Sequence, residues 1–256
     1  MREGRLAPLF HVEVQLNQGT IEGQCNAGCL LFMSAACSDR QKTDASDITL
    51  YTQLAASKKH SRMDTPDSWK QTWLAALSRF GWALKAHETL SLPAAELGSG
   101  TLWEWTHRHV PVFFPRQLVR EGGILMKRSV AAHPEQPALE LLIPHIIEPV
   151  PTSLAWDQMA PVPEHRIGLQ FAYCGPASGL NLVVLSLKTR QTLKSGFLIE
   201  VLDPKAVVGN VEVTYYSVEM LERVYGPLRA SIGRALEERR VIMISPLQEV
   251  ADDHPE

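Results

Sequence analysis

The sequence predicts an α+β fold in which a mostly antiparallel sheet packs with helices, either as one domain or as two sub-domains. Apolar residues make up 45% of the 256 residues and charged residues 21%, which is typical of a soluble globular chain with a buried core. Stretches with strand-like alternation and stretches with helical spacing both occur, but they do not alternate regularly enough for a doubly wound parallel sheet. The formal charge of −3 argues against nucleic acid as a partner, because such proteins need a surplus of cations.

The chain is divided by a segment rich in proline. Seven of the 17 prolines lie between residues 133 and 163, and each fixes φ and removes a backbone donor. We therefore expect an irregular connection over 133–163 between an N-terminal α+β part, 1–132, and a C-terminal α+β part, 164–248. A polar tail follows at 249–256. A single domain with one long excursion is the alternative, and both remain open.

In the N-terminal part, residues 10–16 alternate as in a half-buried strand, and the apolar run 29–37 is the expected partner. A helix is expected to begin with Asp44 or Ser46 as its cap and to end at 58–60. A second helix begins at Thr65 and Pro66, presents the apolar stripe Trp69, Trp73, Ala76, Leu77 and Phe80, and ends at Gly81. Residues 82–92 then form a strand.

The C-terminal part is expected to begin with strands over 167–173 and 180–188, the second of them central because it is apolar almost throughout. Two more strands are predicted over 197–202 and 211–216. A long helix capped by Ser217 follows, either kinked at Pro227 or interrupted there by a turn. A last strand is expected over 241–244.

The N-terminus has no apolar region and cleavage site of the kind that marks a secretory signal. The apolar run 29–37 is about half as long as the roughly 20 residues that span a bilayer, so we expect no transmembrane segment. Four cysteines in a chain of this length are too sparse for a disulfide scaffold. We therefore expect a cytoplasmic protein, or one exported without a cleaved signal peptide.

One aromatic tract is a candidate surface for a partner. If residues 103–109 form a strand, alternation places four side chains on one face, and Phe113 extends the apolar character beyond it. This predicts a protein partner or self-association through Trp103, Trp105, His107, His109 and Phe113. The spacing of the two histidines resembles that of the cupin metalloenzymes. Aromatic residues stand where the cupin carboxylate would lie, however, so we expect no metal and no other cofactor.

Cys174 is the candidate nucleophile, because it ends an apolar strand at a turn that contains glycines. It needs a base, for which His165 and His145 are the candidates. The cysteines at 25, 29 and 37 lack the paired spacing of a structural zinc site and are expected to be buried thiols.

No coherent catalytic set appears in the sequence. The prediction is therefore a soluble binding or interaction protein of bacterial type, and not an enzyme. The alternatives are a small hydrolase or acyl-transfer enzyme that uses Cys174, and a secreted effector or toxin-like protein.

Overall fold

The computed structural model describes residues 21–108, 116–132, 137–150, 163–177, 179–193 and 196–247. In this part of the chain eight strands form one open sheet with the order β3-β7-β6-β5-β2-β1-β8, and β4 pairs with β5 beside that path. The strands are β1 (Ile21–Asn26), β2 (Cys29–Ser34), β3 (Trp82–Pro93), β4 (Ile147–Pro149), β5 (His165–Cys174), β6 (Gly179–Thr189), β7 (Asn210–Met220) and β8 (Ile244–Pro246). The predicted α+β class is confirmed.

The sheet is mostly antiparallel. Among the described strands, β2 and β5 form the one parallel pair, with Leu31 opposite Ala172 and Met33 opposite Cys174. Every residue of β2 is buried, which requires cover on both faces of the sheet. Strands from both predicted parts pair in this sheet, because β2 comes from the N-terminal part and β5 from the C-terminal part.

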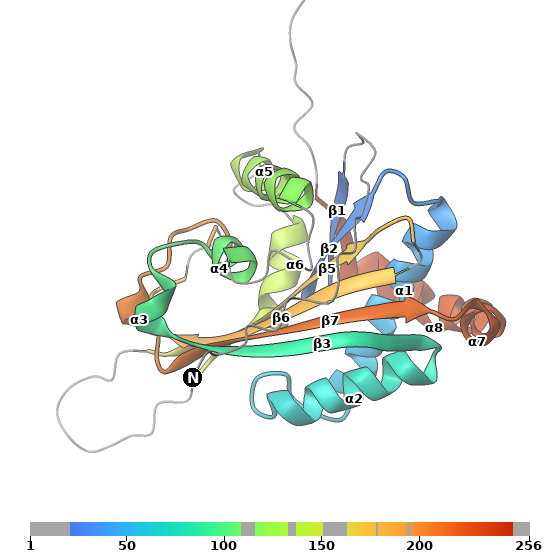
Figure 1. Ribbon diagram of the computed structural model, residues 1–256, viewed down its shortest axis with the longest axis horizontal. Coiled ribbons are helices and arrows are strands. Elements are labelled where there is room, and N and C mark those ends of the chain that lie inside the picture. Colours follow the sequence, from blue (N-terminus) through green and yellow to red (C-terminus); the bar gives the residue numbers. More distant parts are fainter. Residues whose placement is uncertain are drawn as a thin grey trace, which may run out of the picture.

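Helices cover both faces of the sheet, so the molecule has three layers (Figure 1). One face carries α1 (Asp39–Ser57), α2 (Pro66–Arg79), α7 (Glu222–Tyr225) and α8 (Arg229–Met243). The other carries α3 (Ala94–Leu97), α4 (Leu102–Arg108), α5 (Arg116–Ala132) and α6 (Pro137–Ile146). Within the described residues, no helix is long and apolar enough to cross a membrane.

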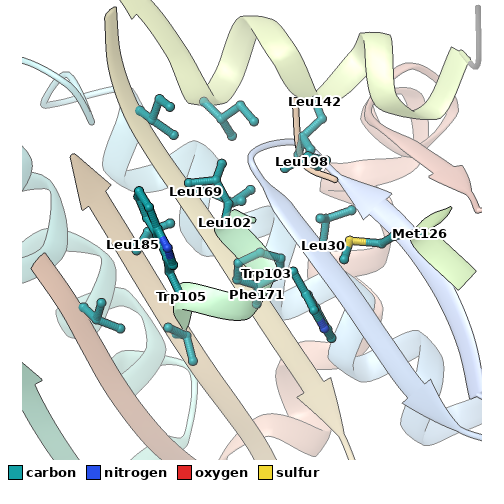
Figure 2. Close-up of a cluster of buried hydrophobic side chains, with 14 of the residues drawn as sticks. Leu30, Leu102, Trp103, Trp105, Met126, Leu142, Leu169, Phe171, Leu185 and Leu198 are labelled. Atoms are coloured by element: carbon teal, nitrogen blue, oxygen red, sulfur yellow. The ribbon is translucent and has the colours of Figure 1, made fainter. Parts of the chain in front are cut away.

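Side chains alternate between two cores, one on each face of the sheet. In β2, Leu30 and Phe32 belong to the core under α4, α5 and α6, while Leu31 and Met33 belong to the core under α1 and α2. Figure 2 shows the first of these cores, where Leu30, Phe171 and Trp103 meet. Both cores draw on strands and helices that lie far apart in the sequence.

Several predicted elements are confirmed. The second helix begins after Thr65 with Pro66 in its first turn, and Gly81 follows its end with a φ of 81°. The strands predicted over 82–92, 167–173, 180–188 and 211–216 correspond to β3, β5, β6 and β7. β6 lies in the interior of the sheet, as its apolar sequence predicts.

The predicted start of the first helix is wrong, because α1 begins several residues earlier. Ser38 is its N-cap: the Ser38 hydroxyl accepts from the Gln41 amide at 3.3 Å, and the Gln41 side chain accepts from the Ser38 amide at 2.9 Å. Asp44 therefore lies inside the helix, where its buried carboxylate pairs with Arg229.

Three predictions for the C-terminal part are also wrong. Residues 197–202 form turns and an isolated bridge rather than a strand. Ser217 lies within β7, because the cross-strand pairing with β3 and β6 continues past it. The helix α8 extends to Met243, so only Ile244 of the predicted last strand is extended. Pro227 lies in a 3₁₀ turn, Gly226–Leu228, which separates α7 from α8.

Within the proline-rich segment 133–163, the described residues 137–149 form α6 and β4, where an irregular connection was predicted. Pro137 opens α6, where a missing N–H costs nothing, and Pro144 lies near its end. The predicted strand over 10–16 and the tail 249–256 lie outside the described residues.

Candidate functional site

The outer edge of β3 is the most exposed regular element of the sheet. β3 is twelve residues long and stands at one end of the strand order, with β7 as its neighbour. Seven of its residues are exposed, namely Leu84, Lys85, His87, Glu88, Thr89, Ser91 and Pro93. In the described part of the chain no strand pairs with its outer side. At the opposite end of the sheet, β8 is only three residues long.

Three exposed apolar residues lie on β3 and on the segment that runs from the end of β7 through α7. Leu84 is 46% exposed and lies opposite Val218 in the β3–β7 ladder. Leu221 and Val224 are exposed as well, and they belong to the segment that directly follows β7. We call these three residues, Leu84, Leu221 and Val224, the β3–α7 corner.

Gly81 positions the β3–α7 corner. Its carbonyl oxygen accepts a hydrogen bond of 2.8 Å from the amide of Leu221, which ties the start of β3 to the start of α7. A Cβ atom on Gly81 would lie 2.7 Å from Cβ of Val224, so α7 packs directly on the glycine. The positive φ and this close approach both require glycine here.

The described residues of the predicted aromatic surface are buried. Residues 102–108 form α4 rather than a strand, and Trp103, Trp105 and His107 are all buried in the core of this chain. The indole of Trp105 donates to the Gly98 carbonyl at 3.1 Å, and that of Trp103 donates to the Val119 carbonyl at 3.0 Å. These side chains are therefore covered within one copy of the chain. His109 and Phe113 lie outside the described residues.

A capping box explains why α4 is a helix. The Thr101 hydroxyl accepts from the Glu104 amide at 3.1 Å, and the Glu104 carboxylate accepts from the Thr101 amide at 3.0 Å. The sequence Thr-Leu-Trp-Glu at 101–104 is the typical signature of this motif, and it outweighs the strand-like alternation of the tryptophans. This was the signal in the sequence that could have predicted the helix.

The structure separates Cys174 from its candidate bases. Cys174 and His165 are the two ends of β5, which places them about 30 Å apart at some 3.3 Å per residue. The carbonyl of His145 lies beside Gly28, which directly precedes β2. Met33, the register partner of Cys174, lies near the other end of β2. The prediction of a nucleophile assisted by His165 is therefore wrong.

Cys174 instead lies against Cys37. Their Sγ atoms are 3.8 Å apart, although 137 residues separate them in the sequence. Cys37 lies in the turn between β2 and α1, and Cys174 is the last residue of β5, the parallel neighbour of β2. Both cysteines therefore lie at the carboxyl ends of parallel strands. The spacing of the cysteines in the sequence gives no sign of this proximity.

The four thiols differ in their electrostatic environment. The hydrogen bond between the two thiols lowers the pKa of Cys37, and the Ser34 backbone and Lys42 act in the same direction against burial. That same hydrogen bond and burial raise the pKa of Cys174. Burial raises the pKa of Cys25 to about 12 and that of Cys29 further still. Of the four, Cys37 is therefore the thiol whose thiolate is favoured.

Metal-ligating side chains do not cluster in the described ranges: no three of His, Cys, Asp and Glu there come together in a way that would hold an ion.

Comparisons with known proteins add little to this geometry. No family model matches the chain, and no curated protein matches it. Among solved structures, a delta-endotoxin chain aligns with 86% of this chain and 91% of its own, at 8% identity and a TM-score of 0.38. A TM-score of that size does not establish a shared fold, so nothing about the endotoxin is transferred to this protein.

Proposed function

We propose that the protein is a binding protein that holds an extended segment of a protein partner along the outer edge of β3. The observation that carries the proposal is the length and exposure of this end strand. An end strand presents unpaired N–H and C=O groups, and proteins usually shorten, bulge or cover such edges. β3 is the longest strand among those described, and although its register with β7 shifts once, between Leu84 and Ala86, no strand of the described residues pairs with its outer side.

Adding a strand to a sheet edge is a common way to recognise a peptide. Main-chain hydrogen bonds supply affinity, while side-chain contacts at the edge supply specificity. The β3–α7 corner provides such contacts, because Leu84, Leu221 and Val224 would be shielded from water by a bound segment. The exposed β3 residues Lys85 and Glu88 carry charges of opposite sign, and Lys85 also pairs with Glu219 at 2.8 Å.

The structure favours a partner protein over self-association through the aromatic tract, because Trp103 and Trp105 are already covered within one chain. It gives no support to the hydrolase alternative, in which His165 was the base for Cys174. Four free cysteines fit a reducing compartment and support the proposed cytoplasmic location.

Capture of the partner with two matched variants tests the proposal. The Leu84→Lys, Val224→Lys double variant places charges on the β3–α7 corner. The control is Val241→Lys on α8, because Val241 is 82% exposed and α8 leads into β8 at the opposite end of the sheet. Each tagged chain is expressed in its native host and cross-linked through lysines before purification.

We expect one protein to be captured by the wild type and by Val241→Lys, with a cross-link at Lys85, and to be reduced at least about tenfold by the double variant. Equal capture by both variants, or cross-links that avoid Lys85, would show that binding occurs elsewhere. A cross-link from Lys85 to a second copy of this chain would show that the edge of β3 binds another copy of the chain instead of a different protein.

A further inference from the structure

A pair of thiols remains that the proposed function does not use. Cys37 and Cys174 come from opposite halves of the sequence and meet with their Sγ atoms 3.8 Å apart. A disulfide needs about 2.05 Å between sulfur atoms. The difference is small enough for side-chain rotation and a slight movement of the turn after β2.

The surroundings distinguish this pair from the other two cysteines. Cys37 is only 5% exposed, but Ala35, Ala36 and Ser38 beside it are exposed, so the turn that carries it faces solvent. On the other strand, Pro176 and Ala177 after Cys174 are exposed in the same way. Cys25 and Cys29 are fully buried within strands or at their ends.

The two segments are also held together independently of the thiols. Gln41, in the first turn of α1, donates a hydrogen bond of 2.9 Å to the Pro176 carbonyl. The Sγ atom of Cys37 lies 3.4 Å from the carbonyl oxygen of Cys174. The start of α1 and the end of β5 therefore keep the two sulfur atoms adjacent.

We propose that Cys37 and Cys174 form a redox-active thiol pair that reacts with a hydroperoxide and closes to a disulfide. The Cys37 thiolate attacks one peroxide oxygen: an S–O bond forms, the O–O bond breaks, and the leaving oxygen takes a proton. The sulfur of Cys37 is oxidised to a sulfenic acid and the peroxide is reduced.

Cys174 then resolves the sulfenic acid. Its sulfur attacks the sulfur of Cys37, the S–O bond breaks, and the leaving hydroxide takes the proton of the Cys174 thiol as water. In total, two thiols and one hydrogen peroxide give one disulfide and two waters. The lowered pKa of Cys37 and the raised pKa of Cys174 suit these two roles, attack and resolution.

Thiol counting on the folded protein tests the proposal. One equivalent of hydrogen peroxide is added, the excess is removed with catalase, and free thiols are counted after unfolding. The wild type should fall from four free thiols to two, and dithiothreitol should restore four. Cys174→Ser should trap Cys37 as a sulfenic acid that reacts with dimedone, whereas Cys37→Ser should retain its three thiols.

Peptide mapping of the oxidised wild type makes the test independent of how the variants fold. Cleavage after Phe32 separates Cys37 from Cys25 and Cys29, so the expected product is a cross-link between the Cys37 and Cys174 peptides alone. Four remaining thiols after oxidation, a cross-link to Cys25 or Cys29, or dimedone labelling of Cys174 before Cys37 would each overturn the proposal. A change in partner capture would not bear on it.

Discussion

The Nδ1 atom of His107 lies 2.7 Å from the carbonyl oxygen of Trp103, one helical turn earlier in α4. The two rings also pack together, with centroids 4.0 Å apart. His107 is thus an interior residue of the core. Because its imidazole is removed from water, its titration is coupled to folding.

We predict that His107 makes stability depend on pH. Burial lowers its pKa to about 4, while an ordinary histidine titrates near 6.5. Between these values the unfolded chain binds a proton that the folded chain does not, so the contribution is complete above pH 6.5 and is lost as the pH falls towards 4. The difference corresponds to about 3 kcal/mol.

Urea unfolding of the wild type and of His107→Gln between pH 7.5 and pH 4, a range set to span this titration, measures that dependence. The free energy of unfolding should fall more steeply with decreasing pH in the wild type than in the variant. Parallel pH profiles would show that His107 is charged in the folded protein or exposed to water.

The ion pair between Asp44 and Arg229 should be important for stability. Arg229 donates from Nε to Oδ1 at 2.7 Å and from Nη2 to Oδ2 at 2.9 Å, and the Asp44 side chain is 2% exposed. Arg229→Met leaves a buried carboxylate without its cation and should cost about 3 kcal/mol. The control is Arg190→Met, which removes a pair with Glu164 whose side chains are 55% and 25% exposed and should cost less than about 1 kcal/mol. Equal losses in the two variants would contradict the burial of Asp44.

Gly81→Ala should destabilise the protein more than Gly209→Ala. Both glycines have positive φ, 81° and 76°, so each substitution strains the backbone by about 1 to 2 kcal/mol. Only at Gly81 would the new Cβ also meet Val224, at 2.7 Å, whereas nothing lies within 4 Å at Gly209. Thermal unfolding should therefore give a clearly lower Tm for Gly81→Ala, and similar values would argue against the packing of α7 on β3.

Trp105→Ala should destabilise the protein without changing its oligomeric state. Trp105 has no exposed surface, and replacing a buried tryptophan with alanine typically costs about 3 to 5 kcal/mol. Calorimetry measures the loss of stability, and light scattering on the remaining folded protein measures its mass. A halved mass with unchanged stability would instead place Trp105 in an interface between copies.

Local signals predicted the fold class and most interior strands. The nearly continuous apolar run of β6 and the Thr65–Pro66 start of α2 depend on nearby residues only, and both predictions are confirmed. The same approach misplaced α1 and α4, because capping boxes at Ser38 and Thr101 decided where these helices begin. Such motifs are visible in the sequence, but the neighbouring apolar patterns were given more weight.

Long-range relationships could not be predicted in this way. The approach of Cys37 to Cys174 follows from the parallel pairing of β2 with β5, which no local pattern encodes. Arg62, in a short basic run, turns inward, donates to Gln53 at 2.7 Å and stacks over Trp69. The exposed position of β3 likewise depends on strand order, a property of the whole sheet.

Hydrogen exchange of the captured complex tests most directly whether β3 is the binding edge. Amide exchange is measured by mass spectrometry for the free protein and for its complex with the captured partner. The proposed function predicts new protection in residues 82–93 and at the β3–α7 corner, with exchange in β1 and β8 at the opposite end unchanged. Unchanged exchange over 82–93, with protection appearing elsewhere, would contradict it.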